Sequence, residues 1–471
     1  MPEQTLAAPA VEELARAFSG ELMQPGDGGF DEARLVWNGL HDRHPALIAR
    51  CSSPEDVVTA VNFARDHDLE VAVRGGGHSA PGYATCDDGI VIDLSPMNKV
   101  EVDADDKTAR AEAGTTWGEF DAATQEHGLA VTGGRFSTTG IAGLTLGSGS
   151  GWLERKCGLT ADNLISAEIV TAAGERVTAS ADENADLFWG IRGGSGNFGI
   201  VTSFTYRLHE VGPMIYGGML LATPDRARDT LAFMRDYMAE APDDLGGGVA
   251  FVNAPPAPFV PPELQHQPVV GVIVCWTGSP DEGERVVAPI RNVMKPVVDV
   301  VQPMPYTALQ SMLDEGGPKG IRGYMKAEFL EDLEDDLIDK LVEHGGKRPG
   351  PLVQLLMEPM GGAISRVGED DTALGRRDVP WCYHALALWM EPDQETADVH
   401  VGWAKALAAD VKPHTVDGVY LNYTSDEGEE RVRSSYGPVK YDRLVALKDR
   451  YDPDNMFHLN QNIRPSQNGR G

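Results

Sequence analysis

Val73-Arg74-Gly75-Gly76-Gly77-His78-Ser79 is the stretch that decides how this 471-residue chain is organised. It follows a β-rich run at 69–73 and places three consecutive glycines before a histidine and a serine. A turn without Cβ atoms can take positive φ, and its N–H groups can converge on a phosphate-sized anion. The stretch therefore predicts a nucleotide cofactor with His78 held against it. From these residues alone, the alternative is a glycine-rich surface turn beside an ordinary polar histidine.

A second glycine-rich loop raises the question of a Rossmann dinucleotide site. Gly194, Gly196 and Gly199 have the G-x-G-x-x-G spacing. That fingerprint needs a strand before the glycines and a helix after them, because the pyrophosphate rests on the helix N-terminus. Here a predicted helix at 186–192 precedes the loop and a predicted strand at 200–208 follows it. The loop at 75–77 also lies between two predicted strands, so both patterns argue against a Rossmann NAD site.

The chain is strongly acidic, with 72 Asp and Glu residues against 40 Lys and Arg and a formal net charge of −32. The acidic residues are spread along the sequence, with runs at 103–106, 331–336 and 427–430. Such a surface disfavours nucleic acids and anionic membranes as partners. It indicates a protein from a salt-adapted organism, and the alternative is a generic acidic enzyme of ordinary habitat.

Cysteine usage and the N-terminus bear on the compartment. The five cysteines are scattered and never in C-x-x-C spacing, so we predict neither a disulfide framework nor a metal site. The first residues lack the basic and apolar regions of a signal peptide, and no apolar run reaches membrane-spanning length. We expect a soluble, cytoplasmic protein without a membrane partner.

Local patterns predict mixed secondary structure. Ser53-Pro54-Glu55-Asp56 is typical of a helix start, and residues 164–178 predict a hairpin. The stretch 140–152 contains five glycines, which favours turns lying against a ligand over a helix. After about residue 210, apolar β runs alternate with helical stretches and predict an antiparallel sheet with helices on one face. The segment Tyr420–Tyr423 is predicted as a short β-like run.

Five stretches, taken in order, resemble the berberine-bridge-enzyme-like FAD-linked oxidases of the vanillyl-alcohol-oxidase, or PCMH-type, superfamily. They are Arg74-Gly-Gly-Gly-His78-Ser79, Gly140-Ile-Ala-Gly143-Leu-Thr-Leu-Gly147, Gly158-Leu-Thr-Ala-Asp162-Asn163-Leu164, Arg192-Gly-Gly-Ser-Gly196-Asn197-Phe198-Gly199-Ile200-Val201-Thr202 and Tyr451-Asp-Pro-Asp-Asn455-Met-Phe457. The resemblance spans nearly the whole chain and implies a two-domain α+β fold. Residues 1–208 and 425–471 would form a discontinuous FAD-binding domain, and residues 209–424 a substrate domain with an antiparallel sheet.

The resemblance also implies how FAD is held. In that family the histidine of the glycine motif is bonded to the C8 methyl group of the flavin, which implies a covalent link at His78. Some members add a second link through a cysteine, and Phe136 stands at the corresponding place here, so a single bond is expected. Further FAD contacts are implied at Arg74, Gly75, Gly76, Gly77, Ser79, Gly82, Gly134, Thr139, Gly140, Gly143, Gly147, Gly151, Leu153, Gly199, Val201, Asn460 and Asn462.

The catalytic base of the family falls on the Tyr-x-Asn-Tyr segment, which implies Tyr423 in that role beside Asn422. A phenol whose pKa is lowered by nearby positive charge can take the proton of a substrate hydroxyl while a hydride passes to the flavin. The alternative is a tyrosine that only packs, with its hydroxyl group satisfied. Tyr383, Gln354, Glu358 and Asn422 are candidate substrate contacts, with scaffold roles as the alternative, because the sequence does not tell which face of each strand they occupy.

The resemblance therefore implies an FAD-dependent oxidoreductase that oxidises a C–OH or C–N carbon of a small molecule, with O2 as electron acceptor and H2O2 as product. One alternative is a flavin dehydrogenase that uses a different acceptor. Another is a flavin-binding protein without turnover. The oligomeric state is left open.

Overall fold

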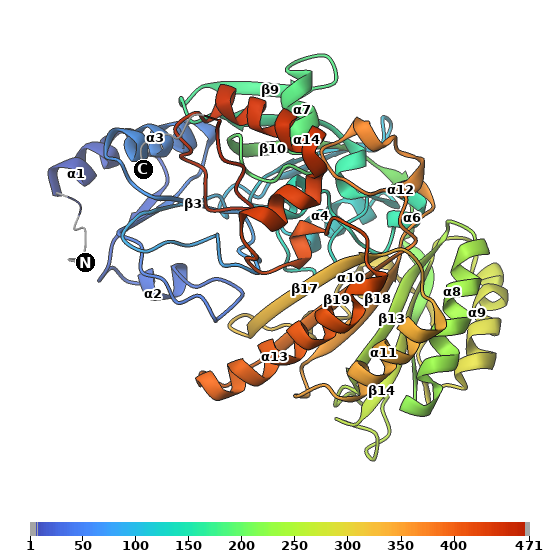
Figure 1. Cartoon of the computed structure of the whole chain (residues 1–471). Helices are drawn as coiled ribbons and strands as arrows, with labels where there is room; N and C mark the ends of the chain where they lie inside the picture. The colour runs from blue at the N-terminus through green and yellow to red at the C-terminus, as the bar shows by residue number, and fades with distance from the viewer. Residues whose placement is uncertain (1–5, 7, 467–471) are drawn as a thin grey trace.

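The computed structural model describes residue 6 and residues 8–466. Figure 1 shows a large sheet formed by the middle of the chain, with the N-terminal and C-terminal segments gathered together beside one edge of it. No helix in the described part of the chain is long and apolar enough to span a bilayer.

The N-terminal segment forms a four-stranded sheet in the order β1-β2-β4-β3. Its elements are α1 Ala8–Ala17, β1 Glu21–Met23, α2 Phe30–Ala33, β2 Leu47–Arg50, α3 Pro54–Asp66, β3 Val71–Arg74 and β4 Ile90–Asp93. The predicted start of α3 is confirmed, since the Ser53 hydroxyl oxygen accepts the Asp56 N–H at 3.2 Å. β4 pairs in parallel with β2 and β3. The three glycines follow β3 directly and leave the sheet at its edge.

A five-stranded antiparallel sheet comes next, in the order β5-β6-β10-β8-β9. Its strands are β5 Val100–Asp103, β6 Thr108–Glu112, β8 Leu164–Val170, β9 Arg176–Ser180 and β10 Ile200–Arg207, and α4 Trp117–Gln125 and α7 Ala185–Ile191 pack nearby. β8 and β9 confirm the predicted hairpin. α7 precedes the glycines at 193–199 and β10 follows them, which confirms the helix-loop-strand order that argued against a Rossmann site. A short pair joins β7 Leu129–Ala130 to β11 His209–Glu210.

The prediction of turns over 140–152 was wrong for its first half, which forms helix α5 Ile141–Leu146. The glycines lie mainly at its ends, Gly140 as N-cap and Gly147 as C-cap. A Cβ on Gly140 would lie 2.3 Å from the backbone nitrogen of Gly76, so this glycine permits close packing of two loops. Buried contacts of Ile141 and Leu146 override the low helix propensity of the segment. A second short helix, α6 Glu154–Cys157, follows.

The middle of the chain forms an eight-stranded antiparallel sheet. Its strands are β12 Met214–Ala222, β13 Leu245–Asn253, β14 Pro268–Trp276, β15 Val298–Asp299, β16 Gln302–Pro305, β17 Arg322–Leu330, β18 Gln354–Pro359 and β19 Trp381–Trp389. The helices here are α8 Ala227–Glu240, α9 Pro280–Met294, α10 Tyr306–Gln310, α11 Asp335–Gly346, α12 Ala363–Arg366 and α13 Gln394–Val411. Side chains of α8, α9, α11 and α13 share one buried cluster with the sheet, which confirms the predicted sheet with helices on one face (Figure 1).

The C-terminal segment returns to the N-terminal one. The predicted β-like run at Tyr420–Tyr423 was wrong, since Leu421–Tyr423 form a 3-10 turn. α14 Glu429–Tyr451 follows, with non-helical backbone at Gly437. The buried Lys448 ammonium donates to the carboxylate of Asp452 at 2.6 Å and to the carbonyl oxygens of Asn197 and Phe457. These bonds attach the chain end to the glycine loop before β10.

Candidate active site

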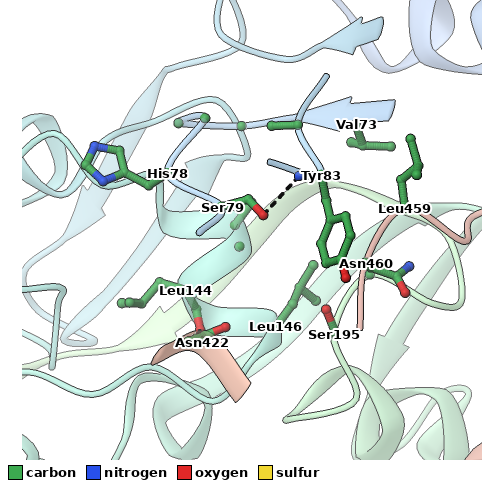
Figure 2. Close-up of a pocket in the computed structure, with 18 of the residues that line it drawn as sticks. Val73, His78, Ser79, Tyr83, Leu144, Leu146, Ser195, Asn422, Leu459 and Asn460 are labelled. Carbon is green, nitrogen blue, oxygen red and sulfur yellow. Dashed lines mark hydrogen bonds between the residues drawn. The ribbon is translucent and has the colours of Figure 1, made fainter. Parts of the chain in front are cut away.

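Five main segments that are distant in sequence line a cavity of about 240 Å³. They are the glycine loop after β3, helix α5, the loop before β10, the turn with Leu421 and Asn422, and the last turns at 457–461. Figure 2 shows His78 at one end of this cavity and Leu459 and Asn460 at the other. The predicted site residues that line it are Gly75, Gly76, Gly77, His78, Ser79, Thr139, Gly140, Gly143, Gly199, Val201, Asn422 and Asn460.

The lining fits a flavin nucleotide held through backbone and amide groups. None of the described residues that line the cavity is Asp, Glu, Lys or Arg. Gly77 has φ +71°, and a Cβ built on Gly77, Gly143 or Gly196 meets no atom within 4 Å, so these glycines face open space. The buried side-chain oxygen of Asn460 has no hydrogen-bond partner. These groups leave backbone and amide positions free for a ligand.

His78 lies at the boundary between this cavity and a second one of about 740 Å³ on the other side of the glycine loop. Its ring stacks on Trp37 with ring centroids 5.2 Å apart. Nε2 is 2.9 Å from the Thr138 hydroxyl oxygen. Burial lowers the pKa of His78 to about 4. The imidazole is therefore neutral at pH 7 and keeps a nitrogen lone pair, which bond formation to carbon requires.

Several predicted cofactor residues lie outside the first cavity. The Arg74 guanidinium donates to the carbonyl oxygens of Ala33, Arg34 and Ala84, so its side chain braces the glycine loop and lines the second cavity. A Cβ on Gly147 would lie 2.0 Å from the Asn422 side-chain oxygen, so Gly147 supports a lining residue. The others that do not line the first cavity are Gly82, Gly134, Gly151, Leu153 and Asn462.

Tyr423 belongs to a polar cluster next to the cavity that Asn422 lines. Its hydroxyl oxygen accepts a hydrogen bond from Arg135 Nη1, and its O–H donates to the Ser150 oxygen at 3.1 Å. The His384 ring stacks on the phenol ring, with centroids 4.1 Å apart and planes 5° apart. Tyr423 thus lies beside a positive charge, as expected for a residue that handles a proton.

The expected direction of the Tyr423 pKa was wrong. Burial of the phenol raises its pKa well above 10, and the Arg135 charge opposes this only in part. The free energy needed to remove a phenolate from water exceeds its attraction to the Arg135 guanidinium, because Arg135 also pairs with two carboxylates. Tyr423 is therefore a neutral phenol at pH 7.

Arg135 is the centre of this cluster and was missed in the sequence. Its guanidinium contacts Glu154 Oε1 at 3.0 Å and Glu358 Oε1 at 3.1 Å, and it lies 4.9 Å from the ring centroid of Trp152. Arg135, Glu154 and Glu358 are all buried. The available signal was Arg135 itself, because it is the one charged residue between Gly133 and Leu153.

The structure settles which face each candidate strand residue occupies. Glu358 of β18 and His384 of β19 point toward Arg135 and Tyr423. Tyr383 packs with the helices on the opposite face of the sheet, so it does not lie with the other predicted substrate contacts. Gln354 begins β18 on the same face as Glu358, since the two are four residues apart along one strand.

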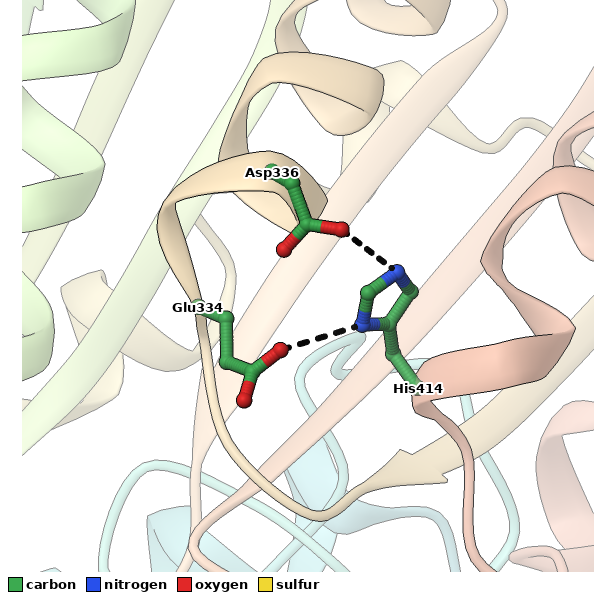
Figure 3. A group of neighbouring side chains, drawn as sticks. All are labelled: Glu334, Asp336 and His414. Carbon is green, nitrogen blue, oxygen red and sulfur yellow. Dashed lines mark ion pairs between the residues drawn. The ribbon is translucent and has the colours of Figure 1, made fainter.

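One group in the described part of the chain has the composition of a metal site. Glu334 and Asp336, at the start of α11, lie around His414 (Figure 3). The ion-pair distances are 3.6 Å for His414 Nδ1 to Glu334 and 3.3 Å for Nε2 to Asp336. Lys340 Nζ lies 2.9 Å from the same Nε2, so an ammonium group already occupies a ligand position. The group links α11 to the segment after α13.

A glycine loop carrying a histidine, a neutral cavity and a buried Tyr-Arg cluster together define a flavoprotein oxidoreductase. Comparison with known proteins agrees. Residues 45–180 match the family model described as FAD binding domain, and residues 419–464 match the model described as berberine and berberine like.

The chain belongs to the berberine-bridge-enzyme-like family of FAD-linked oxidoreductases. An FAD-linked oxidoreductase of Dictyostelium discoideum is 30% identical, with 98% of each chain covered. The (R)-6-hydroxynicotine oxidase of Paenarthrobacter nicotinovorans is 31% identical over 95% of this chain and 97% of its own length. The crystal structure of 6-hydroxy-D-nicotine oxidase from Arthrobacter nicotinovorans superposes with a TM-score of 0.86 at 30% identity, covering 98% of this chain and 100% of that one. The predicted PCMH-type α+β fold is confirmed.

Proposed function

We propose that this protein is an oxidase that binds FAD covalently through His78, oxidises a C–N or C–OH carbon of a small molecule, and uses O2 as acceptor with H2O2 as product. Residues 1–208 with 425–471 would hold the FAD, and residues 209–424 would cover the substrate. The observation that supports the proposal is that Tyr423 contacts Arg135 and follows Asn422, which lines the cavity bounded by the glycine loop and His78.

When bound, FAD supplies the electron sink for the substrate carbon and the route to oxygen. The residues of the chain supply position and proton handling. Backbone N–H groups of the glycine loop and the side chain of Asn460 bind the cofactor, and His78 fixes one end of it. Tyr423 faces the substrate hydroxyl or amine as a hydrogen-bond partner, oriented by Arg135 and by the stacked His384 ring. This fixed geometry lowers the entropic cost of reaching the reactive arrangement.

A single covalent link is supported by the positions of the cysteines. All five are buried, and none of them is among the described residues that line the first or second cavity. Phe136, at the place where some relatives have a second link, packs toward Gly317, whose added Cβ would lie 2.9 Å from the ring. Among the described residues that line both cavities, His78 is the only one with a nucleophilic side chain.

The substrate class can be tested with two panels of compounds. The relative named (R)-6-hydroxynicotine oxidase is similar over nearly its whole length, which favours cyclic amines as the first panel, with alcohols and sugars as the second. We expect oxygen uptake and peroxide formation with at least one panel. Reduction of a dye without oxygen uptake would instead indicate a dehydrogenase. Absence of flavin bleaching with every compound would indicate binding without turnover.

The central test is the visible spectrum of the purified protein before and after acid precipitation. Yellow colour should stay with the pellet of the native protein and be released to the supernatant in His78→Ala. Thr138→Val, which removes the hydroxyl group near His78 Nε2, is the matched control and should keep the colour in the pellet. A colourless native protein after expression with added riboflavin would contradict FAD binding, and colour that His78→Ala retains in the pellet would contradict the link.

A further inference from the structure

The polar cluster around Tyr423 is closed off from solvent except at Tyr423 itself. Arg135, Ser150, Glu154 and Glu358 are between 3% and 8% exposed, whereas Tyr423 is partly exposed. A buried ion pair or triad is weak evidence for stability, because desolvation offsets the attraction. The arrangement therefore calls for a role other than holding the fold together.

A continuous chain of hydrogen bonds runs inward from the phenol. The Tyr423 O–H donates to Ser150 Oγ at 3.1 Å, and the Ser150 O–H donates to Glu154 Oε2. The Gly151 N–H donates to the same Glu154 oxygen at 3.1 Å, and Arg135 Nη2 donates to the other one at 3.0 Å. The chain runs from Tyr423 through Ser150 to Glu154, so a proton leaving Tyr423 has a carboxylate acceptor two hydrogen bonds away.

The cluster has one more carboxylate than it has cations, so one carboxylate can hold a proton. One guanidinium lies between two carboxylates, and Glu358 Oε2 is buried without a hydrogen-bond partner. The groups near Glu358 are Arg135, Glu154, Tyr423 and Cys382, the cross-strand partner of Glu358, and His384 stacks on Tyr423. Burial raises the pKa of Glu358 to about 7, with Arg135 opposing and Glu154 adding to the rise. Glu358 therefore titrates near neutral pH.

We propose that Ser150 and the Glu154–Arg135–Glu358 triad act through Tyr423 as a relay that accepts the proton of the substrate hydroxyl or amine. The proton passes from the substrate to the Tyr423 oxygen, the Tyr423 proton to Ser150, and the Ser150 proton to Glu154. One proton moves and no electrons move with it, and Glu154 becomes a neutral acid. The relay explains how a phenol that stays protonated at pH 7 can still serve as the proton acceptor.

The relay rests on the proposed oxidase function, and its test separates the two. The first measurement is anaerobic flavin bleaching by substrate, as a function of pH, in Ser150→Ala and Glu154→Gln. We expect the rate to fall by roughly 10²–10⁴-fold, the range for loss of general base catalysis, with unchanged flavin content and far-UV circular dichroism. Glu328→Gln is the control, because Glu328 is also a buried carboxylate paired with an arginine, Arg431, at 2.6 Å. Native rates and a native pH profile in both relay variants would overturn the relay.

A second measurement needs neither substrate nor turnover. Infrared difference spectra between pH 5.5 and 8.5 should show the carbonyl band of a protonated carboxylic acid that is lost in Glu358→Gln and shifted in Glu154→Gln, but kept in Glu328→Gln. Identical bands in the native protein and Glu358→Gln would contradict a shared proton in the triad. If no substrate bleaches the flavin while the Glu358 band is present, the oxidase proposal fails and the titrating pair remains.

Discussion

At the scale of single residues, Tyr423 contacts Arg135 and Ser150, while Asn422 beside it lines the cavity, so the proposed proton handling and cofactor binding fall on neighbouring side chains. Tyr423→Phe keeps the ring that stacks on His384 and removes only the hydroxyl group. We expect flavin content to stay native and anaerobic flavin bleaching to slow by roughly 10²–10⁴-fold. Tyr451→Phe in α14 is the control and should bleach at the native rate. A Tyr423→Phe protein with native kinetics would assign the proton to another group.

Glu358 gives a pH dependence with a defined sign. Its pKa is raised to about 7, so Glu358 is ionised above pH 7 and the proposed relay accepts a proton more readily there. Flavin bleaching should therefore accelerate as pH rises from 6 to 8 in the native protein. Glu358→Gln, which is neutral at every pH, should flatten this limb of the profile. A limb that persists unchanged in Glu358→Gln would place the titrating group elsewhere.

At this scale the sequence predicted residues that belong to a local motif, but not residues that folding brings together from distant segments. His78 and the three glycines before it could be singled out because their spacing is local, and they line the cavity. Arg135 and Glu154 were missed, since they gain their roles only when the segment at 133–154 folds against β18, more than 200 residues further along the chain. Tyr383 was placed with the site because strand alternation gives two faces without telling which face is inward.

At the scale of elements, α5 carries its glycines for two different reasons. Gly140 packs against Gly76, whereas Gly143 faces the cavity, since an added Cβ meets nothing within 4 Å. Gly143→Leu should fold normally but lower bound flavin several-fold, because the side chain would project into the space that the cofactor fills. Gly402→Leu in α13 is the control, as Gly402 is also helical and open but faces solvent. The ratio of flavin absorbance to protein absorbance tests both, and full flavin loading in Gly143→Leu would place the cofactor elsewhere.

The contact between α4 and α10 contains a buried carboxylic acid, Asp121, which lies outside the proposed relay. Asp121 accepts one hydrogen bond, from Gln310 at 2.8 Å, and its other oxygen has no partner. Burial raises the Asp121 pKa from 3.8 to about 7, with the Gln310 bond opposing. Between these values the folded state holds a proton that the unfolded state releases, so the free energy of unfolding falls as pH rises from about 4 to 7.

Asp121→Asn should remove this dependence because the amide is neutral throughout. We expect the variant to gain on the order of 1–3 kcal/mol over the native protein between pH 5 and pH 8, as one pKa unit corresponds to about 1.4 kcal/mol. Chemical denaturation at the two pH values checks it, with the exposed Asp182→Asn as control. A stability difference that is the same at both pH values would show that Asp121 is ionised in the folded state.

The element predictions succeeded where local chemistry and tertiary packing agreed. The α3 cap and the β8–β9 hairpin followed from local signals. The helix α5 and the 3-10 turn at Leu421–Tyr423 did not, because both are set by packing around the cavity, which overrides propensity.

At the scale of the whole molecule, charge is the property that the fold exposes most uniformly. The acidic residues of the runs at 103–106 and 331–336 are exposed, and in the run at 427–430 Glu429 and Glu430 are exposed while Glu427 is partly buried. The chain has 72 acidic residues against 40 basic ones, so like-charge contacts outnumber ion pairs on its surface. Added salt weakens the attraction in each ion pair, but it also weakens the repulsion in the more numerous like-charge contacts. Adding salt should therefore stabilise the folded state on balance.

We expect the melting temperature to rise steadily between about 0.01 M and 1 M NaCl, as the screening length falls from about 30 Å to about 3 Å. Sucrose at matched osmolality is the control for water activity, and a smaller rise in sucrose would identify charge screening as the cause. The double variant D105N/D106N removes two exposed acids that form no ion pair in the described structure, and it should melt higher than the native protein at low salt and equally at 1 M. A melting temperature that falls with NaCl would mean that the ion pairs outweigh the repulsion, and the acidic surface would then have no part in adaptation to salt.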